Sequence, residues 1–91
     1  MYLVGDIGNS EIKVCLINSK KKTIKKFNFT SKNISLKKIR KNFKSLDQYY
    51  SKINKILFCS VVPKILRLVK YYLKTKTNTK CFEIKDLDLS S

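Results

Sequence analysis

The stretch Tyr2-Leu-Val-Gly-Asp-Ile-Gly-Asn-Ser10 decides the fold of this chain, because an apolar run leads into a carboxylate and then into a tight turn. Apolar residues alternate again from Ile12 to Leu16, so the turn is expected to join two antiparallel strands. A carboxylate at the end of a strand can hold Mg²⁺, directly or through water. The glycine after it lets a phosphate approach the backbone. The pattern predicts a phosphate-binding turn.

The predicted site is built from small and polar side chains. Asp6 is the candidate metal ligand and Gly8 leaves room for the phosphate. Asn9 and Ser10 offer an amide and a hydroxyl, and asparagine tolerates the left-handed backbone that tight turns often use. Lys13 follows near the base of the turn. A plain β-hairpin is the alternative for this turn taken alone. No Gly-x-x-x-x-Gly-Lys run occurs, which excludes a P-loop.

Size and composition indicate one small α/β domain. The chain has 91 residues, of which 43% are hydrophobic, enough for a modest core. No apolar run of roughly 18 residues is present to span a bilayer, so a cytoplasmic protein is expected. There are three cysteines and no histidine, which argues against a Cys/His zinc site and favours buried, reduced thiols.

The net charge of +15 comes almost entirely from lysines spread along the chain. A nucleic-acid binder would gain affinity from such charge, but it usually also carries arginines for base contacts or exposed aromatic residues. The aromatic residues in the strand patterns look like core residues: Phe27, Phe29, Phe58 and Phe82. Solvated basic faces, with an anionic substrate, are therefore favoured over a nucleic-acid partner.

The order of elements read from the sequence is strand, strand, strand, helix, strand, helix, strand. The expected strands are residues 2–6, 11–18, 23–30, 55–62 and 81–84, and the expected helices begin near Ser35 and at Pro63. The run from 55 to 62 is continuously apolar, which is typical of a strand buried on both faces. Right-handed crossovers then make a mixed five-stranded sheet. Asp6 and Ser60 are expected at the same sheet edge, where ligands bind in open α/β sheets.

Two motifs resemble the N-terminal portion of type III pantothenate kinases, of the actin and sugar-kinase superfamily. The first is the turn Asp6-Ile-Gly-Asn-Ser10 together with Lys13, and the second is Cys59-Ser-Val-Val-Pro63 at the start of a helix. The family patterns read Asp-x-Gly-Asn-Thr and Ser-Ser-Val-Val-Pro, so Ser10 replaces threonine and Cys59 replaces serine. The resemblance covers nearly the whole chain.

The resemblance implies a ribonuclease H-like half-domain, with residues 1–85 as an N-terminal ATPase lobe and 86–91 as a polar tail. It implies ATP-dependent phosphorylation of pantothenate in coenzyme A synthesis, with Mg²⁺ and K⁺ or NH₄⁺ as cations. Asp6 would orient magnesium, and residues 8–13, Glu11 included, would form the first phosphate loop. A carboxylate at position 11 repels polyphosphate unless it points away.

The family's second half carries an Asp-Leu-Gly-Thr motif, a catalytic aspartate and much of the pantothenate pocket, and none of these occurs in the 91 residues. We therefore assign no catalytic residue here and expect a truncated lobe that is inactive alone and completed by a homodimer or a missing second lobe. The alternative is a small, basic, non-catalytic binding module for a nucleotide, a nucleic acid or a protein partner. A third possibility is a remnant without function.

Overall fold

A computed structural model describes residues 1–85 of the chain, so the predicted polar tail, 86–91, lies outside the described residues. The elements follow the predicted order βββαβαβ, with two short 3₁₀ turns, Lys44–Leu46 and Tyr50–Lys52, between the first helix and the fourth strand. Their bounds are β1 Tyr2–Ile7, β2 Glu11–Ile17, β3 Thr23–Thr30, α1 Leu36–Phe43, β4 Lys55–Ser60, α2 Pro63–Lys74 and β5 Cys81–Glu83.

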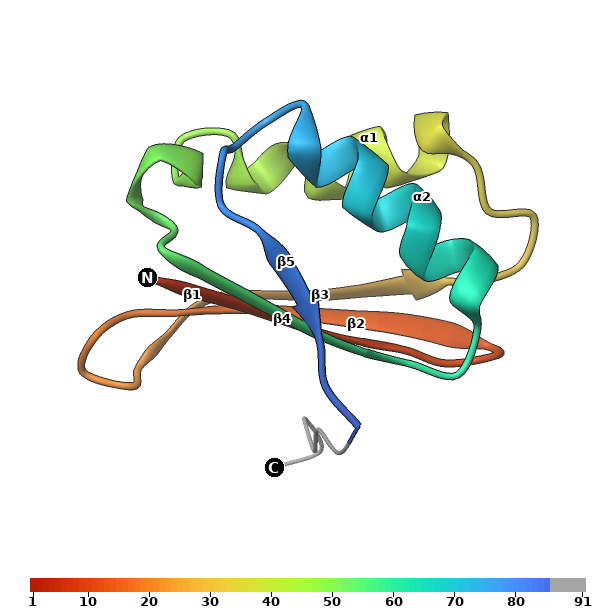
Figure 1. The fold of residues 1–91 in the computed structure, drawn as a ribbon, viewed down its shortest axis with the longest axis horizontal. Helices are drawn as coiled ribbons and strands as arrows, with labels where there is room; N and C mark the ends of the chain where they lie inside the picture. Colours follow the sequence, from red (N-terminus) through yellow and green to blue (C-terminus); the bar gives the residue numbers. More distant parts are fainter. Residues whose placement is uncertain (86–91) are drawn as a thin grey trace.

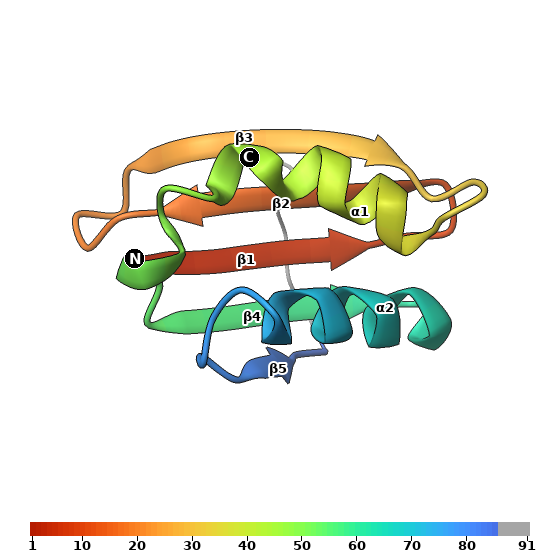
Figure 2. The ribbon, with the colours of Figure 1, turned by 90° about the horizontal axis from the view of Figure 1, so that it is seen from above.

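The five strands form one mixed sheet in the order β3-β2-β1-β4-β5. The first three strands are an antiparallel meander, and β4 and β5 run parallel to β1. Both helices lie on the same face of the sheet, α1 over β1 and β2 and α2 over β4 (Figures 1 and 2). The predicted α/β half-domain with a mixed five-stranded sheet is confirmed.

The core fills the space between the sheet and the two helices. Alternate residues of β1 and β2 point into it and are fully buried, as are Phe43 of α1 and Phe58 of β4. Gly5 makes room for Phe58, because a Cβ atom there would lie 2.1 Å from a ring carbon of that phenylalanine. Sequence reasoning gave Gly5 no role, since nothing in the chain shows which ring lies across the strand.

Both helix starts follow the predicted local signals. The Ser35 hydroxyl accepts a hydrogen bond of 3.2 Å from the backbone N–H of Lys38 and so caps α1. Pro63 occupies the first turn of α2, where its missing N–H costs no hydrogen bond. The apolar stripe of the first helix extends to Leu46, which the structure places in the 3₁₀ turn that follows α1.

Two predictions about burial were wrong. The fourth strand is not buried on both faces, since Ile56 and Phe58 are buried while Leu57 and Cys59 are only partly so. Phe82 is 48% exposed and is not a core residue. The exposure of these side chains of β4 and β5 has one cause. Both helices cover the same face of the sheet, and no described helix covers the other face. All three cysteines are free; Cys15 is buried as expected, whereas Cys59 and Cys81 are half-buried.

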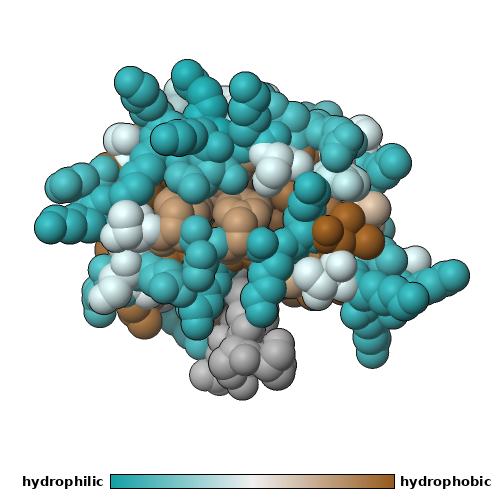
Figure 3. Space-filling model, turned by 180° about the vertical axis from the view of Figure 1, so that it is seen from behind, coloured by the Kyte–Doolittle hydropathy of each residue, from teal (hydrophilic) through white to brown (hydrophobic). Residues whose placement is uncertain are grey.

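Most lysines of residues 1–85 are exposed. Viewed from the β3 side, hydrophilic side chains project from the helices and along the sheet edge, with apolar surface visible between them (Figure 3). Neither helix of residues 1–85 has the length and apolar character needed to cross a membrane.

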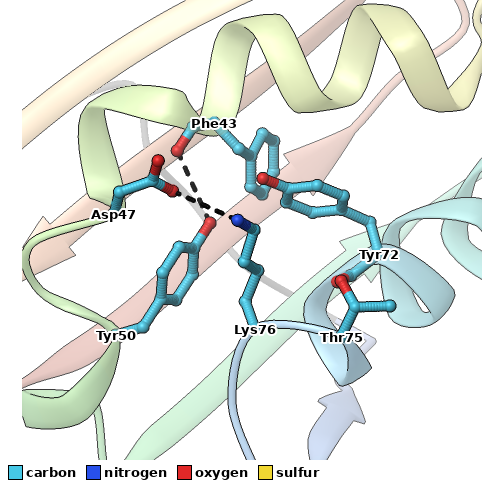
Figure 4. Close-up of polar contacts among 6 residues, drawn as sticks. All are labelled: Phe43, Asp47, Tyr50, Tyr72, Thr75 and Lys76. Atoms are coloured by element: carbon cyan, nitrogen blue, oxygen red, sulfur yellow. Dashed lines mark hydrogen bonds and ion pairs between the residues drawn. The ribbon is translucent and has the colours of Figure 1, made fainter.

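A cluster of polar side chains joins the two helices at the end of the molecule where β1 begins. We call Asp47, Tyr50, Tyr72 and Lys76 the distal cluster (Figure 4). Lys76 Nζ lies 3.7 Å from Asp47 Oδ1, and its ammonium lies 5.9 Å from the centre of the Tyr72 ring. The Tyr50 hydroxyl donates to the Phe43 carbonyl at 3.5 Å. The cluster holds the end of α2 against the segment after α1.

Candidate phosphate-binding turn

The turn between β1 and β2 borders an open cavity of about 310 Å³. Five of the six predicted site residues line it: Asp6, Gly8, Ser10, Glu11 and Lys13. The sixth, Asn9, is exposed at the tip of the turn and is not among the lining residues. The structure therefore brings together the residues that the turn motif predicted, at the end of the molecule opposite the distal cluster.

The turn is held in place through its carbonyl groups. The Gly8 N–H donates to the Glu11 carbonyl at 2.9 Å. The Ser31 hydroxyl donates to the Gly8 carbonyl at 2.7 Å, and the Ser31 N–H donates to the Ser10 carbonyl at 3.0 Å. Ser31 is 7% exposed and is the one buried polar residue of the described chain. A buried hydroxyl with this bond fixes the turn against the end of β3.

Sequence reasoning placed Ser31 in a linker, 31–33, and missed this role. A serine just after a strand is common, and only the pairing of β3 with β2 shows which carbonyls it reaches. No local pattern in the sequence carries that information.

The backbone N–H groups of the turn are left for a ligand. Within residues 1–85, neither the Asn9 N–H nor the Ser10 N–H donates a hydrogen bond. Unpaired amides that point to one place form an anion-binding concavity. With the carbonyls of Gly8 and Ser10 occupied and these two amides unbonded, the exposed turn has backbone donors left over for phosphate oxygens.

The expected use of left-handed backbone at Asn9 was wrong. Positive φ occurs at Lys21 and Asn33 and at no glycine, so residues 8 to 11 all keep negative φ. The bonds from Ser31 support the reversal from outside, without a left-handed residue. The glycine at position 8 is instead explained by contact, since a Cβ atom there would lie 3.2 Å from the Glu11 carbonyl oxygen.

Two opposite charges face each other across the strands without forming an ion pair. Asp6 and Lys13 are direct partners in the β1–β2 ladder and both are half-buried. The one ion pair of residues 1–85 lies elsewhere, in the distal cluster. Asp6 and Lys13 therefore remain available to a metal–phosphate group, which would give each of them an opposite charge.

The Glu11 carboxylate is engaged toward β3. Its Oε1 accepts a hydrogen bond of 3.3 Å from the Asn28 side-chain amide, and Asn28 is the β3 partner of Lys13. The bond directs negative charge toward the outer strand, although Glu11 still lines the cavity. This is the orientation that lessens repulsion with a bound polyphosphate.

The donor set fits Mg²⁺ carried by a phosphate. Residues 1–85 contain no cluster of three His, Cys, Asp or Glu side chains that could cage a metal. Mg²⁺ usually keeps several waters and binds through one or two carboxylates plus substrate phosphates. A single carboxylate, Asp6, beside free amides suits that mode, whereas it would not suit a metal held by protein alone.

The second sequence motif meets the first at the same sheet edge. Asp6 pairs with Cys59 and Ile7 with Ser60 in the parallel β1–β4 ladder. The Val61 N–H donates to the Ile7 carbonyl at 3.0 Å, and the Ser60 hydroxyl accepts from the Val62 N–H at the same distance. The start of α2 thus lies at the end of the sheet that carries the β1–β2 turn, as Figure 2 shows.

Comparison with known proteins agrees with this arrangement. A family model described as type III pantothenate kinase matches residues 2–90. A curated relative from Pelagibacter ubique (strain HTCC1062), named type III pantothenate kinase, is 44% identical over 90 residues. The aligned region covers 99% of this chain and 36% of the relative, so the chain spans about a third of that protein's length. The chain belongs to the type III pantothenate kinase family.

Proposed function

We propose that residues 1–85 are the N-terminal ATPase lobe of a type III pantothenate kinase, a cytoplasmic phosphotransferase that phosphorylates pantothenate with ATP in coenzyme A synthesis. The observation that carries the proposal is the β1–β2 turn. The Asp6 carboxylate and the Lys13 ammonium, which form no ion pair within residues 1–85, line one cavity together with Ser10, whose backbone amide is unbonded there, and the unbonded Asn9 amide lies at the tip of the turn. Membership of the type III pantothenate kinase family is the basis for the proposed reaction, the phosphorylation of pantothenate.

Each residue of the turn has a role in this proposal. The Asn9 and Ser10 amides, with the Ser10 hydroxyl, donate to phosphate oxygens. Lys13 neutralises part of their charge. Asp6 orients the Mg²⁺ that accompanies ATP, directly or through water. Phosphoryl transfer needs little covalent chemistry from the protein, so positioning and charge neutralisation are the contribution of this lobe.

The remaining parts of the reaction lie outside this lobe in the proposal. The general base and most of the pantothenate pocket belong to the second lobe, and a homodimer or that lobe completes the site. Mg²⁺ supplies charge neutralisation when bound, and K⁺ or NH₄⁺ assists ATP binding. No residue of 1–85 is assigned as catalytic.

Calorimetric titration with ATP and Mg²⁺ at physiological salt tests the proposal. We expect binding by the chain and a loss of at least tenfold in affinity in Asp6→Asn, because the substitution removes the charge that faces the metal. Asp47→Asn is the matched control, since it makes the same change at an exposed carboxylate of the distal cluster. Circular dichroism checks that each variant is folded.

Two results would count against the proposal. Equal affinity in the chain and in Asp6→Asn would remove the metal role of Asp6. Absence of Mg²⁺–ATP binding by a folded chain would favour the alternative of a non-catalytic binding module.

A further inference from the structure

A second and larger cavity lies between α2 and the edge strand β5, and it shares no residue with the phosphate-binding turn. Its volume is about 730 Å³, within the range of pockets that bind ligands. One wall is α2, from Arg67 to Lys74, and the other runs from Thr77 to Cys81 at the start of β5. We call this cavity the α2–β5 groove.

The groove is basic along its whole helical wall. Arg67, Lys70 and Lys74 occur at a spacing of three and four residues, which places them on one side of the helix. No acidic residue of the described chain lines the groove, and none of these cations belongs to the single ion pair of residues 1–85. The Lys80 ammonium is directed elsewhere, 5.3 Å from the centre of the Phe82 ring. Three cations are therefore left to attract an anionic partner.

The floor of the groove is apolar, and the nearest acidic residue of β5 is Glu83, two residues beyond Cys81. Leu73 is 1% exposed, and the Cys81 thiol lies beside it. Burial raises the pKa of the Cys81 thiol to about 11, with Lys70 lowering it and Glu83 raising it, so the thiol is neutral at pH 7. The Tyr71 ring is 61% exposed at the rim. The groove thus combines an apolar floor with a positive wall.

The other wall ends in an unpaired strand edge. β5 is the last strand of the sheet on this side and pairs only with β4 among the described residues. An edge strand presents backbone N–H and C=O groups with which another extended segment can pair. Seven residues of helix rise about 10 Å and three residues of strand extend about 10 Å, so the cationic wall and β5 match in length.

We propose that the α2–β5 groove docks an extended acidic segment of a protein partner, which adds to the sheet beside β5 and directs alternate carboxylates toward α2. Side chains alternate along an added strand, so every second residue faces the helix. A peptide uses both features, the strand edge and the cations, whereas a nucleic acid or a polyphosphate would use only the charge. The proposal is independent of ATP binding at the turn.

Fluorescence anisotropy with labelled octapeptides at physiological salt tests the docking. The probe is an acetylated peptide of alternating aspartate and valine. We expect it to bind, and the peptide in which lysine replaces aspartate to be at least tenfold weaker. An aspartate–valine peptide in which alternate backbone nitrogens are methylated keeps its charge but loses the backbone N–H groups that would donate hydrogen bonds to β5. We expect it to be at least tenfold weaker as well, because the strand pairing is lost.

Two sets of variants locate the site. The triple variant Arg67→Gln, Lys70→Gln, Lys74→Gln should bind the aspartate–valine peptide about tenfold more weakly, since each exposed charge contributes a fraction of that factor. The control removes three exposed lysines of α1 and the 3₁₀ turn that follows it, as Lys37→Gln, Lys41→Gln, Lys44→Gln, and should leave affinity within about twofold. Glu83→Gln, at the far end of β5, should tighten binding slightly.

Three results would overturn the proposal. One is equal binding of the methylated and unmethylated peptides, which would mean attraction by charge alone. Another is no peptide binding by the folded chain. The third is tighter binding of single-stranded oligothymidylate that depends on the same three α2 residues, which would assign the groove to nucleic acid.

Discussion

A carboxylate lies beside a lysine at each end of the molecule, and the two pairs behave differently. At the distal cluster Asp47 and Lys76 form an ion pair at 3.7 Å, with side chains 47% and 36% exposed (Figure 4). At the β1–β2 turn Asp6 and Lys13 are direct ladder partners and form none. In the first pair the two charges attract each other and so join two segments of the fold. The second keeps them beside a cavity, which is what a ligand site needs.

The hydrogen bonds of the two ends differ in the same way. At the turn the Gly8 and Ser10 carbonyls are bonded by Ser31, and the amides of the exposed residues Asn9 and Ser10 have no partner in the part of the chain that the structure describes. At the distal cluster the atom without a partner in residues 1–85 is the Tyr72 hydroxyl, which is buried. A free donor in contact with solvent is available for binding, whereas a buried one only lowers stability. The contrast yields four predictions.

The largest effect is expected from removing Lys13, the lysine of the pair at the turn, with Lys76 of the distal cluster as the matched control. Lys13→Ala should weaken Mg²⁺–ATP binding by roughly 2 kcal/mol, about thirtyfold, because a hydrogen bond to a charged group contributes about that much. Lys76→Ala should leave ATP affinity unchanged. Isothermal calorimetry of both variants makes the measurement. Equal losses in the two would mean that ATP responds to overall charge and not to the turn.

The next effect concerns the support of the turn. Ser31→Ala removes a buried hydrogen bond of 2.7 Å and leaves the Gly8 carbonyl without it, which should lower the free energy of unfolding by about 1–3 kcal/mol. It should also weaken ATP binding, because the amides of Asn9 and Ser10 lose their fixed direction. Ser45→Ala, at an exposed serine, is the control for urea denaturation and for calorimetry. Unchanged stability in Ser31→Ala would show that the turn is supported by other contacts.

A smaller effect is expected from the distal ion pair. Asp47→Asn should lower the free energy of unfolding by less than about 1 kcal/mol, since both partners are substantially exposed. Raising the salt concentration should shrink the difference between Asp47→Asn and the unaltered chain, because salt screens exposed charges. A loss of several kcal/mol in urea denaturation would mean that the cluster carries more of the fold than its exposure indicates.

The smallest effect is a change in pH dependence. Burial raises the pKa of Tyr50 above its ordinary value of 10.0, and the neighbouring Tyr72 and Asp47 add to this. The folded chain holds that proton more tightly than the unfolded chain, so the stabilisation is complete below pH 10 and is lost as the pH rises above it. Tyr50→Phe should therefore flatten the decline of the urea midpoint above pH 10. Tyr71→Phe, at a tyrosine 61% exposed, should decline like the unaltered chain.

Local signals in the sequence were enough to predict the secondary-structure elements and to group most residues of the candidate site. The alternation through Ile12 and Leu16, the serine cap at Ser35 and the proline at position 63 each have a local physical cause, and each element was found where these signals predict it. The turn residues were found for the same reason, because a carboxylate, a glycine and small polar groups in five positions belong to one short loop.

Contacts between distant segments could not be predicted in this way. The role of Ser31 depends on where β3 ends relative to the turn, and that of Gly5 depends on the ring of Phe58 across the β1–β4 ladder. The exposure of Phe82 depends on which face of the sheet the two helices cover. These are properties of register and layering, which the hydrophobic pattern of a single strand does not contain.

The most direct test of the phosphate-binding turn is nuclear magnetic resonance of the isotope-labelled chain during titration with Mg²⁺–ATP. We predict that the backbone amide resonances of Asn9 and Ser10 shift most, with Lys13 next, and that Asp6→Asn abolishes these shifts while Asp47→Asn preserves them. Shifts confined to the α2–β5 groove, or resonances of the turn that do not move at saturating Mg²⁺–ATP, would contradict this prediction.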